Sequence, residues 1–267
     1  MKLFKRLAIA TFFIPLILYI FYVGNLFLFT FLGALSLFLM FEMRELLQNK
    51  NINLPKITIP LVFMILLFGI YFDIFAVTIF LTILLFSLND ILRNKFEHTF
   101  AKISALTFSL LYLIFPLITI YKISETPNGN WMMLMLISLI WLVDSAAFFV
   151  GMKFGKRKNI FLVSPNKSLI GFVAGIVSAF LFSFLLAFVI QKIFDENCIF
   201  SVYQKIILAV SSGIIGQFGD LFESMLKRNF KVKDSSNLLP GHGGFLDRFD
   251  SLLFAAPTLF ILLKFMK

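Results

Sequence analysis

Repeated apolar runs determine what this chain can fold into. A helix needs about 20 mostly apolar residues to cross about 30 Å of hydrocarbon. Hydrocarbon cannot hydrogen-bond an open backbone, so each long apolar run is expected to be a helix. A mean hydropathy of +0.96 lies far outside the usage of soluble proteins. We therefore predict an all-α integral membrane protein, a polytopic bundle of about nine transmembrane helices at about 5–23, 25–41, 57–72, 74–88, 103–121, 132–150, 169–191, 206–226 and 251–266.

The chain is expected to form one integral-membrane domain over residues 1–267, because no repeat, linker or soluble domain interrupts the apolar runs. Residues 1–130 contain little other than apolar spans with weak resemblance to known proteins. Residues 131–267 contain the polar segments from which a catalytic site is predicted. The third and fourth runs are short, so they are either tilted or joined as a re-entrant pair. The first run follows basic residues as in a signal peptide, but no small-x-small cleavage site closes it, which favours a retained helix.

Basic residues are distributed unequally between the predicted loops. With nine spans, 19 of the 24 lysines and arginines fall on the side of the N-terminus and 5 on the other side. The positive-inside rule makes the first side cytoplasmic and puts the C-terminus outside, in what would be the inner membrane of a bacterial cell. Much of the net charge of +10 is then an orientation signal. No arginine and aromatic interleaving of the RNA-binding kind occurs, so no nucleic-acid partner is expected.

Two acidic residues lie inside apolar runs near their predicted cytoplasmic ends. They are Asp144 in the sixth run and Asp220 in the eighth. An aspartate at mid-helix depth costs roughly 2.5–3.5 kcal/mol on insertion scales, so it needs a cation, a basic partner or a water-filled cavity. A salt bridge between helices would satisfy either residue alone. Ser224 and Lys227 follow Asp220 at i+4 and i+7 on one helical face, which favours a functional site.

Residues 224–250 concentrate charge between the last two apolar runs. Four basic residues precede Pro240, and the run 240–244 reads Pro-Gly-His-Gly-Gly. Its glycines, Gly243 and Gly244 among them, allow backbone N–H groups to approach an anion. His242, set between glycines, has no core to pack into. The segment therefore predicts a phosphate-binding turn.

Asp247 and Asp250 follow this turn at i and i+3, on one face if the last helix begins there. Taken alone, such a pair favours a helix cap with an acidic third residue. Beside the unpaired Asp220, the pair favours a metal site. Oxygen ligands without a cysteine or histidine cluster indicate Mg²⁺. The only cysteine, Cys198, excludes a disulfide within the chain and leaves no thiolate cluster.

The residues of this segment resemble the signature of the phosphatidate cytidylyltransferase (CDP-diacylglycerol synthase) family. The matching pattern is Ser224-x-Leu226-Lys227-Arg228, Lys233-Asp234 and Leu239-Pro240-x-His242-Gly243-Gly244-x-x-Asp247-Arg248-x-Asp250. Upstream, Gly216-x-x-Gly219-Asp220-Leu221-x-Glu223-Ser224 and Asp144-Ser145-Ala146-Ala147-Phe148-x-x-Gly151 also resemble the family. The resemblance covers roughly the C-terminal half of the chain.

One loop departs from the family's usual pattern. Where the family has a second lysine, a glutamate and a glycine, this chain has Asn166, Ile170 and Ala174. These changes question whether the loop takes part in nucleotide binding or pairs with the main site. Lys167 is kept and is expected to meet a phosphate. The other motif residues indicate an active enzyme rather than an inactive relative.

The resemblance implies the reaction of phosphatidate with CTP to give CDP-diacylglycerol and pyrophosphate in phospholipid biosynthesis. It implies that Asp220, Asp247 and Asp250 bind Mg²⁺, and it allows a second cation. The same resemblance, joined to the need to hold phosphates, implies that further residues bind CTP and the lipid head group. These are Lys227 as a catalytic residue, and Ser224, Arg228, Lys233, Asp234, His242, Gly243, Gly244, Arg248, Lys167 and Asp144 as substrate-binding residues. A homodimer is also compatible with the family.

Other functions make different predictions. A transporter would thread polar residues through several spans, whereas here they gather at one predicted face. The D-G-x-x-A-R pattern of the CDP-alcohol phosphotransferases is missing. A CTP-dependent polyprenol kinase is closer in chemistry, since it would release CDP rather than pyrophosphate. A purely structural membrane protein gives no reason for the glycine-rich turn.

Overall fold

The computed structural model describes residues 2–94, 97–155, 160–238 and 243–265, with side chains described from residue 13 onward. In these ranges the chain is helical and has no β-sheet, which confirms the all-α prediction. Its helical segments join into nine continuous helices that coincide with the nine predicted runs. They are α1 (Lys2–Val23), α2 (Asn25–Gln48), α3 (Thr58–Tyr71), α4 (Phe75–Leu92), α5–η1–α6 (Thr99–Ser109, Leu110–Ile114, Phe115–Ser124), α7 (Gly129–Phe154), α8–η2 (Leu169–Val189, Ile190–Phe194), α9–η3–α10 (Val202–Val210, Ser211–Gly216, Gln217–Asn229) and α11 (Leu246–Lys264).

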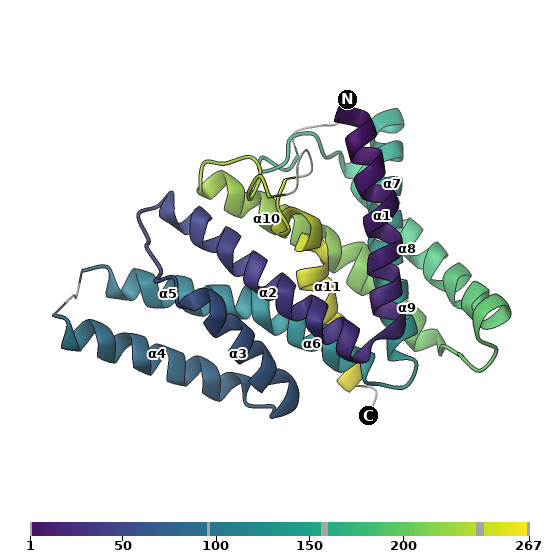
Figure 1. Ribbon diagram of the computed structural model, residues 1–267. Helices are drawn as coiled ribbons and strands as arrows, with labels where there is room; N and C mark the ends of the chain where they lie inside the picture. Colours follow the sequence, from purple (N-terminus) through teal and green to yellow (C-terminus); the bar gives the residue numbers. More distant parts are fainter. Residues whose placement is uncertain (1, 95–96, 156–159, 239–242, 266–267) are drawn as a thin grey trace.

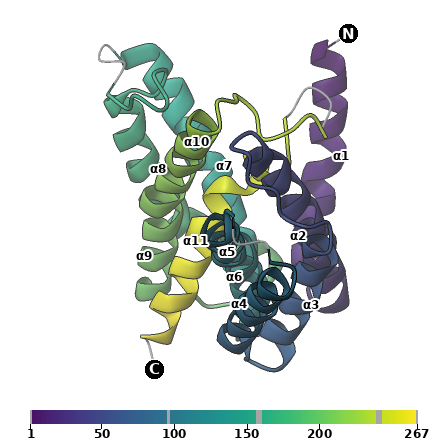
Figure 2. The ribbon, with the colours of Figure 1, turned by 90° about the vertical axis from the view of Figure 1, so that its left-hand side faces the viewer.

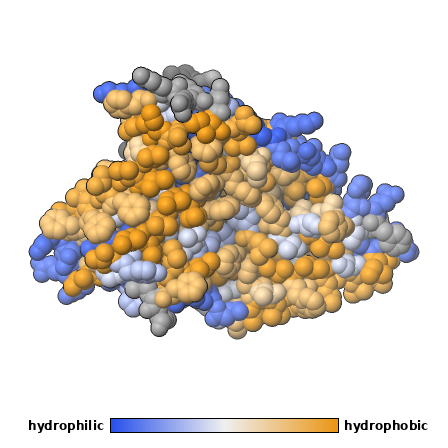
Figure 3. Space-filling model, turned by 180° about the vertical axis from the view of Figure 1, so that it is seen from behind, coloured by the Kyte–Doolittle hydropathy of each residue, from blue (hydrophilic) through white to orange (hydrophobic). Residues whose placement is uncertain are grey.

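Six of these helices are long and apolar enough to cross a membrane, counted over the described residues. They comprise α2, α4, α5–α6, α7, α8–η2 and α9–α10, and the two shorter apolar helices are Phe13–Val23 and Thr58–Tyr71. The surface agrees with this assignment. Seen from behind, it is mainly hydrophobic, with hydrophilic residues gathered along its edges (Figure 3). The chain is therefore an integral membrane protein with at least six helices of spanning length, and the predicted count of nine crossings goes beyond this observation.

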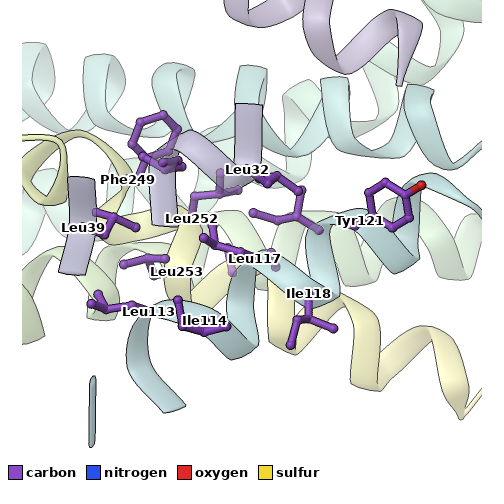
Figure 4. Packing of buried hydrophobic residues seen from close by; sticks show 14 of the residues in the cluster. Leu32, Leu39, Leu113, Ile114, Leu117, Ile118, Tyr121, Phe249, Leu252 and Leu253 are labelled. Carbon is purple, nitrogen blue, oxygen red and sulfur yellow. The ribbon is translucent and has the colours of Figure 1, made fainter. Parts of the chain in front are cut away.

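The core lies where α2, the η1–α6 helix and α11 pack together (Figure 4). Leu32 and Leu39 of α2 are fully buried, and so are Leu113 and Leu117 of the η1–α6 helix. Leu253 of α11 completes this contact. The last helix of the C-terminal half is thus held by helices of the N-terminal half.

The start of α1 and the end of α11 lie at opposite ends of the bundle (Figures 1 and 2). The end at which α1 begins is also the end at which α7 and α10 finish and α8 and α11 begin. The described parts of the predicted polar segments therefore share one end of the molecule with the start of α1.

Three π-helical turns interrupt the long helices, at η1, η2 and η3. A π-helical turn inserts one residue into the helical repeat and so rotates the next part of the helix, and such turns are frequent at functional sites. The η3 turn ends at Gly216, immediately before the helix that carries Asp220. It therefore helps to set the face on which α10 presents its charged residues.

Candidate active site

Small residues allow α7 and α8 to cross closely at the polar end of the bundle. A Cβ added to Gly171 would lie 2.6 Å from the carbonyl oxygen of Ala147 and 3.1 Å from the Cα of Gly151. Ser168 caps the start of α8 by accepting a hydrogen bond from the Gly171 N–H, at 3.1 Å. This crossing holds Lys167, the residue before the capping serine, next to Asp220 of α10.

A second close crossing joins α10 to α11. A Cβ on Gly219 would lie 2.7 Å from the carbonyl oxygen of Asp250 and 3.2 Å from the Cα of Ser251. Only a glycine lets the two backbones approach in this way. The contact brings Asp220, the next residue of α10, beside Asp250.

Three aspartates from three helices lie close enough for their charges to interact. They are Asp144 of α7, Asp220 of α10 and Asp250 of α11. Lys167 contributes an opposite charge, with its Nζ 2.5 Å from Oδ2 of Asp220. The loop that departs from the family's pattern therefore does contact the site, through the ion pair of Lys167 with Asp220. Lys227 also interacts electrostatically with Asp250, so two ammonium groups act on this acidic cluster. A bound cation would further relieve the repulsion among the three acids.

Lys227 forms the second part of the site. Its ammonium pairs with Glu223 one turn earlier on α10 and lies 2.6 Å from Oδ1 of Asp247 on α11. The side chain of Glu223 is fully buried, and those of Asp247 and Lys227 are 7% and 14% exposed. A buried lysine that serves two carboxylates holds the two helices together as well as supplying charge.

Asp247 precedes the apolar part of α11 and organises the loop before it. Its Oδ2 accepts hydrogen bonds from the Gly244 N–H at 2.8 Å and from the N–H and hydroxyl of Ser235 at 3.0 Å. Burial raises the pKa of Asp247, but the bonds from Gly244 and Lys227 outweigh burial and bring this pKa to about 2. The carboxylate is therefore ionised at neutral pH and closes the loop onto the helix.

Glu42 is a site residue that the sequence analysis missed. Its carboxylate is fully buried near the end of α2. It accepts hydrogen bonds from the Ser236 hydroxyl and the Phe245 N–H, both at 2.7 Å, and from the Leu246 N–H at 2.8 Å. The only advance signal was an acid directly after an apolar run, whereas Asp144 lies inside one. Because the second span was expected to end at residue 41, Glu42 was assigned to a loop.

The two described glycines of the turn are required by these carboxylates. Gly243 has a φ of +81°, and a Cβ there would lie 2.5 Å from Oδ2 of Asp247. A Cβ on Gly244 would lie 2.6 Å from both carboxylate oxygens of Glu42 and would also strike Ser235. The glycines thus admit two of the chain's own carboxylates to the loop backbone, and the phosphate contact predicted for them stays a prediction.

We expect the Gly244→Ala substitution to lower the unfolding temperature in detergent by several degrees, since overpacking typically costs about 1–3 kcal/mol. Gly216→Ala is the matched control. A methyl group there would have its nearest neighbours at 3.5–3.8 Å, which is ordinary contact. Equal unfolding temperatures for the two variants would show that the loop does not need the space beside Glu42.

The remaining predicted residues lie around this centre. Ser224 is half-buried on α10 between Asp220 and Lys227, while Arg228, Lys233, Asp234 and Arg248 lie at or near the surface. Arg228 also reaches the loop after α7, where its Nε lies 3.5 Å from the carbonyl oxygen of Val163. His242 falls outside the described residues. The substrate contacts assigned to all of these residues stay predictions.

A divalent cation such as Mg²⁺ needs several oxygen donors around one point. Within the described ranges, no three acidic, histidine or cysteine side chains lie close enough together to form a ready-made metal cluster. Asp144, Asp220 and Asp250, which lie within electrostatic range of one another, nevertheless supply hard oxygen donors of the kind that Mg²⁺ prefers. Asp247 is more fully engaged than the other two predicted ligands, because both of its oxygens already accept hydrogen bonds.

Known proteins resemble this chain over most of its length. A sequence model described as the cytidylyltransferase family matches residues 4–266. A phosphatidate cytidylyltransferase of Bacillus subtilis is 34% identical over 241 residues, which is 87% of this chain and 86% of that protein. The proteins of the same name from Thermotoga maritima and Staphylococcus epidermidis are 36% identical over 192 residues and 31% identical over 246 residues. They cover 71% and 90% of this chain, and the matches span 68% and 91% of those proteins.

Proposed function

Since the chain belongs to the cytidylyltransferase family, we propose that it transfers the cytidylyl group of CTP to phosphatidate, giving CDP-diacylglycerol and pyrophosphate. The observation that carries the proposal is the meeting of three aspartates, Asp144, Asp220 and Asp250, with two lysines at one end of an apolar helical bundle. Such a site can receive a soluble nucleotide and a membrane lipid together.

The chemistry explains the residue types. A phosphate oxygen of the lipid forms a bond to the α-phosphorus of CTP, the bond between this phosphorus and the bridging oxygen breaks, and pyrophosphate leaves. A phosphomonoester with a second pKa near 6 is largely dianionic at neutral pH, so it needs no strong general base. The main obstacle is electrostatic, because two anions must meet while charge grows on the leaving group. Catalysis then consists of positioning and of charge stabilisation.

Each group of residues has a proposed part in this step. Lys227, Arg228, Lys233 and Arg248 bind the CTP phosphates and the lipid head group, and Lys167 joins them from the loop before α8. Ser224, Asp234, His242 and the glycines Gly243 and Gly244 complete the phosphate site. Asp220, Asp247 and Asp250 remain the proposed Mg²⁺ ligands, with Asp144 next to them. Mg²⁺ bound there would neutralise the phosphate oxygens, and a second cation is compatible with the same acids.

The membrane arrangement is proposed as nine crossings, with the N-terminus and the active site in the cytoplasm and the C-terminus outside. This arrangement is supported by the nine continuous helices and by the 19-to-5 division of basic residues. It presents the site to the compartment that contains CTP. The homodimer and the absence of a nucleic-acid partner stay predictions.

The test of this proposal is a product assay. The purified chain in detergent is given CTP labelled at the α-phosphate, phosphatidate and Mg²⁺, with a reaction lacking phosphatidate as the control. We expect pyrophosphate release and transfer of the label to a lipid in equal amounts. Release of CDP together with a lipid labelled only from γ-labelled CTP would assign the chain to the kinases instead.

A further inference from the structure

The buried side chain of Glu42 links the two halves of the chain through its hydrogen bonds. It lies on α2, in the half with weak resemblance to the family, yet all its described hydrogen bonds go to the segment 235–246. We propose that Glu42 is a positioning residue of the active site, which holds the loop before α11 and the first turn of α11 in their working arrangement. This inference rests on the proposed function for its effect on catalysis.

The contacts of Glu42 fall on two separate parts of that segment. Oε1 accepts from the Ser236 hydroxyl and the Phe245 N–H, at 2.7 Å each. Oε2 accepts from the Ser235 hydroxyl at 3.0 Å and the Leu246 N–H at 2.8 Å. The N–H groups of the first helical turn have no partner within their own helix and need an external acceptor. Glu42 is therefore a distant cap for α11 that also fastens the loop to it.

Asp247 holds the same loop from the other side. Ser235 directs its hydroxyl toward both carboxylates, at 3.0 Å from Oε2 of Glu42 and 3.0 Å from Oδ2 of Asp247. A hydroxyl has a single proton, so it can satisfy only one of these oxygens fully at a time. Glu42 and Asp247 thus act on one loop together, and Asp247 is in turn paired with Lys227. A change at Glu42 has a direct structural route to the catalytic lysine.

A carboxylate suits this position better than any other side chain. Four donors meet two oxygens, and an ionised carboxylate accepts all four without donating. Glutamine would replace one oxygen by an NH₂ group, which would face donors instead of receiving bonds from them. Hydrogen bonds to a charged group are also stronger than neutral ones. On either side a serine hydroxyl can turn to accept from the NH₂ group, but a backbone N–H cannot. Glu42→Gln is therefore nearly the same size but loses one backbone hydrogen bond and the negative charge.

The test compares Glu42→Gln with Glu45→Gln, which changes an exposed glutamate one turn later on α2. Two readouts are used: kcat and KM for CTP, and the rate of tryptic cleavage after the exposed residues Lys231 and Lys233. For Glu42→Gln we expect kcat to fall about tenfold or more while KM changes less. We also expect faster cleavage of the loop. Glu45→Gln should match the wild type in both readouts.

Ser236→Ala keeps the test decisive if Glu42→Gln folds poorly, because it removes one contact of Glu42 and leaves the carboxylate in place. Its cleavage rate and kcat should change in the same direction, by less. The double variant should lose less activity than the product of the two single losses, since both act through one bond. Multiplicative losses with unchanged cleavage would show that the two residues do not act together on the loop, and would overturn the proposal. So would a Glu42→Gln protein that equals Glu45→Gln.

The cleavage readout also separates this inference from the proposed function. If the wild-type chain makes no cytidine-bearing lipid but Glu42→Gln opens the loop, the proposed reaction fails and the structural role of Glu42 stands. If the reaction occurs and Glu42→Gln leaves the loop and kcat unchanged, the positioning role alone is refuted.

Discussion

Asp220→Asn is expected to reduce cytidylyl transfer by about a thousandfold or more, because it removes a charge from the centre of the site that is proposed to bind Mg²⁺. Asp220 adjoins Asp250 through the close contact at Gly219 and pairs with Lys167. The substitution keeps the size of the side chain and one oxygen but removes the charge that balances both a cation and the lysine. Initial rates of pyrophosphate release at saturating CTP and phosphatidate measure the effect.

This loss is expected without unfolding. Asparagine can still accept a hydrogen bond from Lys167, so the unfolding temperature in detergent should stay within a few degrees of the wild type. Glu45→Gln, an equivalent change at an exposed acid of α2, is the control and should retain full activity. An Asp220→Asn enzyme with activity within a few-fold of the wild type would remove this carboxylate from the catalytic centre.

Lys227→Met is expected to destabilise the protein by about 3–5 kcal/mol, which is typical when one partner of a buried ion pair is lost. The substitution leaves Glu223, whose side chain is fully buried, and Asp247 without their common cation. Transfer activity should disappear as well, because the same ammonium is proposed to bind phosphate. Thermal unfolding in detergent and the product assay measure the two effects separately.

A second substitution distinguishes stability from function. Adding Glu223→Gln to Lys227→Met neutralises the stranded carboxylate and should recover part of the lost stability but none of the activity. Lys192→Met, at an exposed lysine of the η2 turn, is the control for loss of a lysine and should change neither quantity. Recovery of activity in the double variant would show that Lys227 serves only as a structural counter-ion.

The helices could be predicted from the sequence because each apolar run must satisfy its own backbone in lipid. Nine runs therefore became nine continuous helices over the described residues. The π-helical turns could not be predicted, since η1, η2 and η3 depend on packing with neighbours that are distant in the sequence. The number of helices that cross the membrane cannot be decided from helix length and composition alone. The helix α3, for example, has only 14 residues.

The residues that gather at the site could be selected from the sequence, but the contacts between them could not. Charged residues stand out in an apolar chain, so Asp144, Asp220 and Lys227 could be selected from spacing alone. Their partners could not, because the pairs of Lys167 with Asp220 and of Lys227 with Asp247 join residues 53 and 20 positions apart. Glu42 was missed for the same reason, as its contacts lie 193 to 204 positions away.

The glycine turn shows how one pattern can serve two purposes. A run of glycines before a helix indicates an anion site, and the prediction named phosphate as that anion. In the structure, the anions beside Gly243 and Gly244 are the chain's own carboxylates, Asp247 and Glu42. Sequence spacing detects the need for close approach, but it cannot identify the group that approaches.

The most direct test of the account is whether Asp220 and Asp250 bind a divalent cation together with CTP. Mn²⁺ can replace Mg²⁺ as a paramagnetic probe, and its electron paramagnetic resonance signal reports the bound fraction in the purified protein with CTP present. We predict one saturable site in the wild type, retained in Glu45→Gln and lost in both Asp220→Asn and Asp250→Asn. Unchanged Mn²⁺ binding in the two aspartate variants would contradict the account.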